Sequence, residues 1–526
     1  MGAVVALSAV FAACGGDDDA DTSESTAAPG GDSTEAAGET VAPDDTTDDG
    51  APADGSAITI ALGSEPTSLD PHVVDDGGER AINDNIYETL LTRDADGALG
   101  PGLATDLPTQ VDDTTWEFTL REGVTFHDGT PFNADAVVAS VDRIIRLVAE
   151  EKTDNSGFYG TLAGATAVDD LTVQITTTGP DGVLPARMYW LKIVAPGTEA
   201  NDDLSDAPNG TGPYTFTSRE TGVSIELAAN PDYWDGAPPI ASVRYEFVSE
   251  GGTRLAGLKS GKYDLITNLL PNTVDEAPKY EAKQGQEHPV LILDADEGIT
   301  ADVNVRKALN LAVDKEALAD AIFSGFAAID EGQLLSPSIL GYNDDLEAYA
   351  YDPDEAARLI EEAGVAGETI TLVGESSGRW LNDRDLVEAV AGYWSAAGLE
   401  VDVQTPEFGA YLDILFDRDS RADAIFVSSS NDILDPDRQL STYYQAGGIG
   451  SSNSDADLSA LIDEGRAELD ADARAAIYEE AVQLAYDQAY FVWLVSNQDL
   501  YGLSERLTYT PRVDSKLLVK DMSVSG

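Results

Sequence analysis

The thirty residues WEFTLREGVTFHDGTPFNADAVVASVDRII, which run from Trp116 to Ile145, decide how this chain folds. Apolar residues alternate with polar ones over Trp116–Leu120, which is typical of a strand with one buried face. The alternation resumes at Val124–Phe126 after a turn, so the first half predicts a β-hairpin. Asn133 is a suitable N-cap for the helix that follows. The apolar positions of that helix are Val137, Val141, Ile144 and Ile145.

Taken as a literal string, this stretch resembles the signature of the peptide and nickel family of ABC-transporter solute-binding proteins. Ser64–His72 (SEPTSLDPH) and Ile82–Leu91 (INDNIYETLL) resemble the opening strand and first helix of that family. Asn209–Ser218 (NGTGPYTFTS) and Asn230–Ile240 (NPDYWDGAPPI) resemble its return to the first domain. Val305–Leu318 (VRKALNLAVDKEAL) resembles the helix pair that opens its second lobe. The resemblance runs from residue 58 to the C-terminus.

The resemblance implies an α/β fold of the two-lobed periplasmic-binding-protein class, in its large peptide-binding form (type II). Lobe one is expected to comprise residues 56–94, 206–292 and 489–526. An extra subdomain inserted in lobe one is expected at 95–205, and lobe two at 293–488. The segments that cross between the lobes would form a hinge, so the expected motion is closure over a ligand.

Local signals agree with a mixture of helices and strands. Asp352 is placed to cap a helix that has Pro353 at its first position and Glu355 at its third, and Gly364 is placed to end it. A second helix is predicted at about 471–485, with one face formed by Ile477, Ala481, Leu484 and Ala485. Short apolar runs predict strands at Ala57–Leu62, Thr369–Val373, Glu400–Val403 and Phe491–Val495.

The charge balance of the chain is strongly acidic. Its 526 residues contain 97 Asp and Glu against 30 Lys and Arg, a formal net charge of −67. Nucleic acid is excluded as a partner, because phosphate binding requires clustered Lys and Arg. Such a surface repels itself at low salt, which favours a saline habitat, and an acidic secreted proteome is the alternative.

The N-terminus has the features of a lipoprotein signal. An apolar run at 3–12 is too short to cross a membrane but fits the core of a signal peptide. Phe11-Ala12-Ala13-Cys14 resembles a bacterial lipobox, so residues 1–14 are expected to be a signal peptide and Cys14, the one cysteine, to be lipidated. No basic segment precedes the apolar run, so we expect the true start to lie upstream. Residues 15–55 hold thirteen acids and no Lys, Arg or aromatic residue, which predicts a disordered acidic tether.

Catalytic and metal-binding patterns are sparse. The three histidines are His72, His127 and His288, and they form no HExxH motif and no cluster with cysteine. We therefore expect neither an enzyme nor a cofactor, and no metal site built from side chains. Metal carried as a chelate stays open.

The resemblance implies a ligand-binding role for Asp432. In peptide-binding members of the family, an Asp within a Trp-x-x-Asp-x-x-x-Pro-like segment pairs with the α-amino group of the peptide. The matching stretch here is Ser429–Pro436, in which Asp432 takes the ammonium-binding position and Ser429 replaces the Trp. Phe426 stands where some members carry an Arg for the ligand carboxylate, so the pocket departs from the tripeptide type.

Other pocket residues follow from motif position. Phe408 and Trp493 align with pocket aromatics of the family, and core packing is the alternative for each. The first lobe offers Thr67, Tyr87 and Thr211, and the segment after Asp432 offers Tyr443 and Tyr444. Arg379 and Arg384 are candidate partners for a ligand carboxylate, while Asp294 and Asp296 replace residues that are commonly Asn.

The resulting functional hypothesis is an extracytoplasmic, lipid-anchored, monomeric protein that captures a small polar solute, foremost a short peptide. It would deliver the solute to the permease and ATPase subunits of an ABC importer. An oligosaccharide or a metal chelate is the alternative solute, and a sensor on the same fold is the alternative role. A secreted hydrolase is the alternative from a different functional class.

Overall fold

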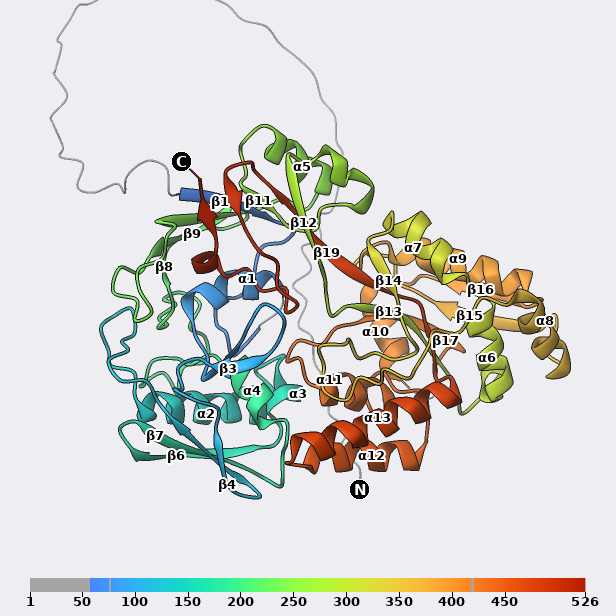
Figure 1. Cartoon of the computed structure of the whole chain (residues 1–526), viewed down its shortest axis with the longest axis horizontal. Coiled ribbons are helices and arrows are strands. Elements are labelled where there is room, and N and C mark those ends of the chain that lie inside the picture. The colour runs from blue at the N-terminus through green and yellow to red at the C-terminus, as the bar shows by residue number, and fades with distance from the viewer. Residues whose placement is uncertain (1–56, 75–76, 418–420, 526) are drawn as a thin grey trace, which may run out of the picture. The chain divides into compact units, whose positions relative to one another are not determined.

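The computed structural model of the protein describes residues 57–74, 77–417 and 421–525 (Figure 1). The predicted signal peptide with Cys14 and the predicted acidic tether lie outside the described residues. The described chain has the expected α/β composition, and its largest sheets contain eight, five and four strands.

The eight-stranded sheet is built around the first described strand. That strand is β1, which spans Ala57–Leu62 as predicted and runs parallel to both β10 and β11. The strand order is β12-β19-β11-β1-β10-β9-β8, and β14 pairs with β19 beside this path. The other strands are β8 (Tyr214–Glu220), β9 (Ser224–Ala229), β10 (Ser242–Phe247), β11 (Leu265–Ile266), β12 (Lys279–Gln284), β14 (Ala327–Ile329) and β19 (Val495–Leu503).

Residues 116–145 contribute to the four-stranded sheet and to one helix. The helix is α2 (Ala134–Ala149), and the Asn133 side chain caps it by accepting the N–H of Ala136. Its predicted apolar face is confirmed, because Val137, Val141 and Ile144 are buried. Figure 1 shows α2 lying along the sheet next to β6 (Leu162–Asp169).

The predicted hairpin is wrong. β5 (Thr115–Thr119) pairs with β4 (Thr109–Asp112) on one edge and with β7 (Thr172–Thr177) on the other. Because both edges of β5 are occupied, Val124–Phe126 has no strand to pair with, and its backbone makes one isolated bridge, between Thr125 and Pro131. Val124 and Phe126 alternate with polar residues because both side chains are buried in the same core.

The five-stranded sheet has the order β16-β15-β17-β13-β18. Its strands are β13 (His288–Leu293), β15 (Thr369–Val373), β16 (Glu400–Gln404), β17 (Ala424–Ser429) and β18 (Phe491–Trp493). β15 and β16 match their predictions. The strand predicted at residues 491–495 is instead divided between two sheets. β18 belongs to the five-stranded sheet, and β19 begins at Val495 in the eight-stranded sheet.

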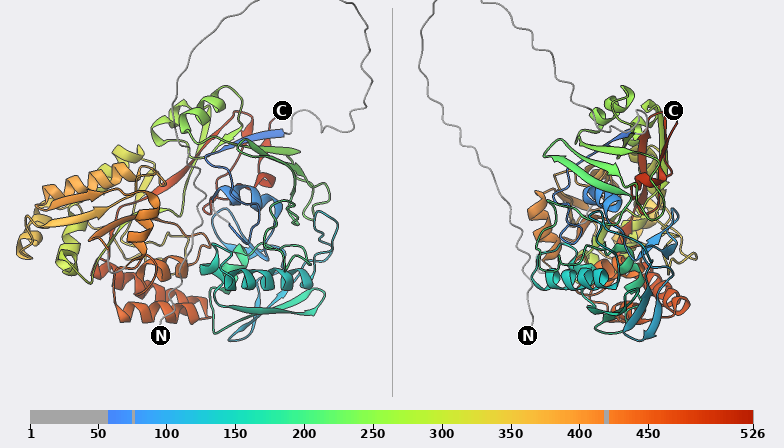
Figure 2. Two further views of the ribbon diagram at one scale, coloured as in Figure 1. Left: turned by 180° about the vertical axis from the view of Figure 1, so that it is seen from behind. Right: turned by 90° about the vertical axis from the view of Figure 1, so that its left-hand side faces the viewer.

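Apart from the excursion to β14, two short segments carry the chain between these large sheets. One lies between β12 and β13 at residues 285–287, and the other lies between β18 and β19 at Leu494. The expected lobe boundaries after 292 and 488 differ from these positions by a few residues. Below, the first lobe means the described residues before 285 and after 494. The second lobe means residues 285–494, and it includes β14 although β14 pairs with β19. Figure 2 shows β19 (red), a strand of the eight-stranded sheet, extending toward the five-stranded sheet.

The capping prediction for the second-lobe helix α8 (Pro353–Glu362) is confirmed. Asp352 accepts the N–H of Glu355 at 3.0 Å, and Gly364 follows the helix with φ of 75°. The predicted face of α13 (Ala471–Gln488) is confirmed in part, because Ala481 and Ala485 are buried whereas Ile477 and Leu484 are only partly buried. Its buried residues are Arg474, Tyr478, Ala481, Val482 and Ala485. The Arg474 guanidinium turns this face inward because it forms a buried ion pair with Asp435 at 2.7 Å.

The remaining helices and strands complete both lobes. In the first lobe they are α1 (Gly77–Ile86), β2 (Leu91–Arg93), β3 (Leu99–Pro101), α3 (Ser156–Tyr159), α4 (Leu184–Trp190), α5 (Gly251–Lys259), β20 (Leu507–Thr508) and β21 (Ser523–Val524). In the second lobe they are α6 (Val303–Leu311), α7 (Lys315–Phe323), α9 (Asp383–Ala396), α10 (Phe408–Phe416), α11 (Pro436–Gln439) and α12 (Ala456–Ala467).

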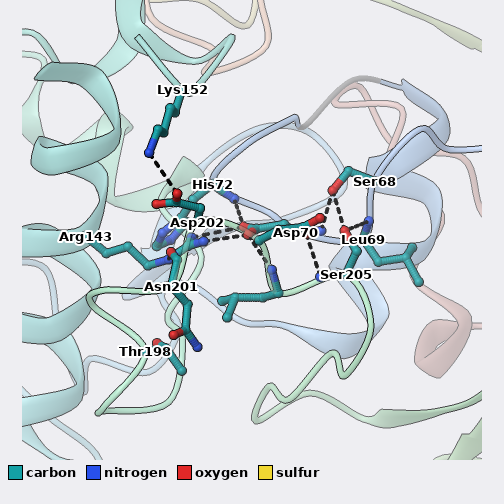
Figure 3. A network of polar contacts seen from close by, with 12 residues as sticks. Ser68, Leu69, Asp70, His72, Arg143, Lys152, Thr198, Asn201, Asp202 and Ser205 are labelled. Atoms are coloured by element: carbon teal, nitrogen blue, oxygen red, sulfur yellow. Dashed lines mark hydrogen bonds and ion pairs between the residues drawn. The ribbon is translucent and has the colours of Figure 1, made fainter. Parts of the chain in front are cut away.

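A buried ion pair fixes the opening segment of the first lobe to α2. Asp70 receives two hydrogen bonds from the Arg143 guanidinium, and both side chains are fully buried (Figure 3). The same carboxylate also accepts the backbone N–H groups of His72 and Leu204, at 3.0 and 2.8 Å. A charge pair removed from water is tolerated when its other hydrogen-bonding positions are filled, as they are here.

Candidate ligand-binding site

A cavity of about 1010 Å³ is lined by residues of both lobes. The first lobe contributes residues from the end of β1, from α1, from the α3 and α4 region and from β19. The second lobe contributes Glu287, which precedes β13, and residues that follow β15 and β17. A second cavity of about 500 Å³ shares several of these residues, including Arg254, Glu287, Arg379 and Asp499. The size of the first cavity fits a small organic ligand.

Asp432 faces this cavity between two arginines. Its Oδ1 lies 3.3 Å from Arg80 Nη1 of α1, and its Oδ2 lies 3.7 Å from Arg438 Nη2 of α11. Both distances exceed the roughly 2.7–2.9 Å of a charge-assisted hydrogen bond. The side chains of Asp432 and Arg80 each keep 18% of their surface accessible. The Asp432 carboxylate therefore has room and acceptor capacity for a further donor.

Aromatic rings extend this arrangement along the cavity wall. The Arg80 guanidinium lies 5.0 Å from the centre of the Trp190 ring, and the Arg438 guanidinium lies 5.1 Å from the centre of Phe158. Phe158 and Trp190 pack against each other with centroids 5.5 Å apart. Cation–π contacts of this kind position a guanidinium while leaving its N–H groups available. The wall can thus bind polar groups and stack against flat or apolar ones.

A loop of the second lobe carries two further wall residues, Arg379 and Trp380. The Arg379 guanidinium stacks 5.0 Å from the centre of the Phe408 ring. Two buried acids anchor the loop, since Glu375 accepts the backbone N–H of Arg379 at 2.6 Å and Asp383 accepts that of Trp380 at 3.3 Å. Burial and a hydrogen bond to Glu375 raise the pKa of Asp383 to about 6.

Arg254 brings a buried positive charge to the wall. The guanidinium donates to the backbone carbonyl oxygens of Val248, Ser249, Thr267 and Asn268. Burial lowers the pKa of Arg254, because the charge lies away from water. Its donors are therefore occupied by the protein backbone.

The second-lobe residues proposed for the pocket are spread between cavity and core. Ser429 is fully buried and its hydroxyl accepts from Gln439 Nε2 at 3.2 Å, whereas its neighbours Ser428 and Ser430 line the cavity. Trp493 is a core residue whose ring stacks on Tyr349 at 6.0 Å. Phe408 packs on Tyr411 and contacts the wall through Arg379.

Tyr443 and Tyr444 occupy similar supporting positions. Tyr443 is partly buried and packs against the same second-lobe core as Tyr444. Tyr444 is fully buried and accepts from Trp493 Nε1 at 3.4 Å. Phe426 is also fully buried and packs edge-on against the wall residue Trp380. These residues lie behind the wall.

The first-lobe residues proposed for the pocket make contacts within that lobe. Thr67 donates through its backbone N–H and its hydroxyl to Glu79. Thr211 is buried and donates to Glu88 at 2.7 Å. Tyr87 is buried beside a separate cavity of about 70 Å³. None of the three is among the residues that line the large cavity in the described parts of the chain.

The remaining charged candidates, Arg384, Asp294 and Asp296, are not among the described residues that line the first cavity. Arg384 lines the second cavity but not the first. Asp294 accepts the N–H groups of Asp296 and Glu297, and Asp296 accepts from Ser454, so these acids organise a loop. Their replacement of Asn therefore has a local structural consequence.

Several wall residues escaped prediction from the sequence. They are Arg80, Arg254, Arg438, Trp190, Trp380, Glu287 and Asp499. Arg438 lies six residues after Asp432, so a helix that begins at the Asp435-Pro436 pair would have placed it near the carboxylate. Arg80 lies just before a segment that resembles the family, and only the fold brings it to Asp432. No local pattern identifies the others.

Hydrolysis finds no support in the arrangement of side chains. Gly374–Gly378 reads Gly-Glu-Ser-Ser-Gly, the letter pattern of a hydrolase nucleophile elbow, and follows β15. The histidine rings are engaged elsewhere, because His72 and His127 bond to backbone carbonyl oxygens and His288 bonds to Asp330 and Ser336. None of the three histidines is therefore available as a base for Ser376.

Within residues 57–74, 77–417 and 421–525, no three His, Cys, Asp or Glu side chains are grouped so that they would hold a metal ion. Within the same ranges no helix has the length and apolar character needed to span a membrane.

Comparison with known proteins gives a consistent result. The family model for bacterial extracellular solute-binding proteins, family 5 (middle region), matches residues 98–451. Heme-binding protein A of Haemophilus influenzae is 28% identical over 488 residues, which cover 84% of this chain and 87% of that protein. Dipeptide-binding protein of Escherichia coli is 29% identical over 430 residues, which cover 74% and 79%.

A solved structure agrees with these relatives. The periplasmic binding protein DppA from Helicobacter pylori, in complex with the peptide STSA, superposes with a TM-score of 0.73 at 25% identity. The match covers 89% of this chain and 98% of that chain. The expected two-lobed α/β fold of the oligopeptide-binding class is thereby confirmed. The chain belongs to family 5 of the bacterial extracellular solute-binding proteins, non-catalytic proteins that bind small solutes for ABC importers.

Proposed function

We propose that this chain captures a short peptide in the cavity between its lobes and delivers it to the permease of an ABC importer. One observation carries the proposal: Asp432 and Arg379 place opposite charges on the wall of the same cavity. The α-ammonium group of a peptide would bind Asp432, and its α-carboxylate would bind Arg379. The dipeptide-binding relative and the peptide complex of the similar structure support the same class of solute.

The walls between these two charges suit a peptide backbone and its side chains. Trp190, Phe158 and Trp380 provide apolar surface, while Ser428 and Ser430 provide hydroxyl groups. A pocket of this kind gains affinity from burial of ligand surface and orientation from a few polar groups. Phe408 supports Arg379 from behind in this proposal, and Ser429, Tyr443 and Trp493 support the wall.

Titration calorimetry with three matched ligands tests the proposal. Trialanine is expected to bind, and N-acetyl-trialanine and trialanine amide are each expected to bind at least about tenfold more weakly, because each lacks one charged end. The Arg379→Gln variant is expected to reduce the difference between trialanine and its amide. Equal affinities for all three ligands would contradict the assigned charges.

A metal chelate is the second candidate solute, because Heme-binding protein A is among the similar proteins. The rings of Phe158 and Trp190, which pack against each other at an angle of 34°, offer an aromatic surface for a flat chelate. An absorbance titration with haem distinguishes the two solutes, since a peptide binder gives no shift of the haem spectrum.

Attachment to the membrane through Cys14 completes the proposal. Residues 15–55 would then separate the binding domain from the lipid anchor, and the partner proteins would be the permease and ATPase subunits of one importer. Incorporation of labelled fatty acid into the native chain, and its loss in Cys14→Ser, tests the anchor.

A further inference from the structure

Two carboxylates face the cavity from the segments that cross between the large sheets. Glu287 lies in the first crossing segment and Asp499 lies on β19, just after the second. Both side chains are partly buried, and both line the first and the second cavity. Among the described residues, neither carboxylate forms an ion pair with a Lys, Arg or His within 4.0 Å.

A third acceptor lies beside them. Asn497 is two residues before Asp499 on β19, so both side chains point to the same face of the strand. Asn497 is buried, with 7% of its surface exposed, and its Oδ1 has no hydrogen-bond partner within the described structure. It lines the second cavity together with Glu287 and Asp499. An acceptor deprived of water and of any donor is costly, and a ligand donor would remove that cost.

Two of the nearby arginines are engaged by other groups, because Arg254 donates to backbone carbonyl oxygens and Arg80 pairs with Asp432. Arg379 stacks on Phe408 and forms no ion pair with Glu287 or Asp499 within the described residues. Burial raises the pKa of both Glu287 and Asp499, and the nearby charges of Arg379 and Arg80 offset this effect only in part. The group that fits these acceptors is a cation with several N–H donors.

We propose that Glu287, Asp499 and Asn497 form a subsite for a basic group of the ligand, a lysyl ammonium or an arginyl guanidinium. The solute of this protein is accordingly a peptide with a basic side chain. This inference rests on the proposed peptide function, to which it adds a preference for one kind of side chain. The subsite is separate from Asp432, which the α-ammonium group would occupy.

The test uses the full chain and three tripeptides, Ala-Lys-Ala, Ala-Gln-Ala and Ala-Glu-Ala, in titration calorimetry. Ala-Lys-Ala is expected to bind at least about tenfold more tightly than Ala-Gln-Ala, because it adds charged hydrogen bonds, and Ala-Glu-Ala is expected to bind most weakly. In Glu287→Gln and in Asp499→Asn the ratio of the first two affinities should fall toward one. Glu361→Gln removes an exposed acid of α8 and should leave the ratio as in the native protein.

Proton release gives a second readout. A ligand cation lowers the raised pKa of a carboxyl group, so Ala-Lys-Ala should release protons on binding in mildly acidic buffer and Ala-Gln-Ala should not. Glu287 faces Asp499, His288 and Arg379, while Asp499 faces Arg80 and Asp514. The charges of these groups act on the pKa of the two carboxyl groups before the ligand binds. Calorimetry in two buffers of different ionisation enthalpy measures the release, which should fall in both variants.

The outcomes separate this inference from the proposed function. If Ala-Glu-Ala binds as tightly as Ala-Lys-Ala, the basic subsite is overturned and the peptide function stands. If no tripeptide binds, the peptide function is overturned, and arginine and spermidine then serve as probes of the subsite alone. Binding of either probe that both variants abolish supports the subsite, and binding of neither overturns it. Should Glu287→Gln fail to fold, Asp499→Asn carries the same test.

Discussion

At the scale of single residues, Asp432 shows how one carboxylate serves two charge partners. Arg80 approaches it from the first lobe and Arg438 from the second, so the carboxylate lies between two positive charges. A ligand ammonium group would replace or join these longer ion pairs with shorter, charge-assisted hydrogen bonds.

Replacing Asp432 by Asn is therefore expected to weaken the binding of trialanine by about ten- to a hundredfold, because a charged hydrogen bond is lost. Titration calorimetry measures the change. Asp457→Asn, which removes an exposed acid of α12, is the matched control and should bind normally. Native affinity in the Asp432 variant would show that the ammonium group binds elsewhere.

Also at the scale of single residues, the Asp70–Arg143 ion pair stabilises the first lobe. Both side chains are fully buried, so removing one leaves the other as an unpaired buried charge. Asp70→Ala is expected to lower the free energy of unfolding by about 3–5 kcal/mol. Urea denaturation measures this loss, and replacing both residues by apolar ones should recover part of it. A loss below about 1 kcal/mol would contradict the role given to the pair.

At the scale of elements, the loop after β15 depends on protonation. Burial and the Glu375 hydrogen bond raise the pKa of Asp383 to about 6, against an ordinary value of 3.8. Burial opposes ionisation of Glu375, yet hydrogen bonds from Asp383 and Ser377 lower its pKa to about 2. Glu375 and Asp383 thus share one proton between about pH 2 and pH 6. The loop that these two acids anchor carries the wall residues Arg379 and Trp380.

A group with a raised pKa stabilises the fold below its unfolded pKa, and this contribution is lost as the pH rises through its folded pKa. The contribution of Asp383 should accordingly be lost between about pH 4 and 7, by about 1–3 kcal/mol. Urea denaturation of the native protein and of Asp383→Asn over this range isolates it, because Asn cannot titrate. Parallel curves for the two proteins would exclude the shared proton.

Elements with strong local signals were predictable from the sequence, and their pairing was not. Asp352, Pro353 and Glu355 specify a helix start through contacts within one turn, so α8 follows from the sequence directly. Val124–Phe126 has the alternation of a strand, but its pairing depends on β4 and β7, which already occupy both edges of β5. The face of α13 depends in the same way on a distant acid, Asp435.

At the scale of the whole molecule, the candidate site depends on contacts that the sequence does not encode locally. Asp432 was recognisable because it lies inside a family-like segment. Arg80 and Glu287 reach the same cavity only after the chain has crossed between sheets, so no spacing rule identifies them. Ser429 alternates with the cavity-lining Ser428 and Ser430 and falls in the core, as Trp493 does. Alignment alone cannot distinguish the two sides of a strand.

The formal charge of −67 makes the whole molecule sensitive to salt. Screening shortens from about 10 Å at 0.1 M to about 3 Å at 1 M ionic strength, which reduces repulsion between surface acids. The melting temperature is expected to rise by about 2–4 °C over this interval. Scanning calorimetry at both concentrations of NaCl measures it, with an equal osmolarity of sucrose as the control for excluded volume. A melting temperature that falls with salt would contradict the account.

Mass spectrometry of the solute that co-purifies with the native protein is the decisive test of the peptide function. We expect short peptides with free amino and carboxyl ends, enriched in lysine and arginine, and we expect the Asp432→Asn variant to lose them. Recovery of haem, another metal chelate or an oligosaccharide in place of peptides would contradict that function.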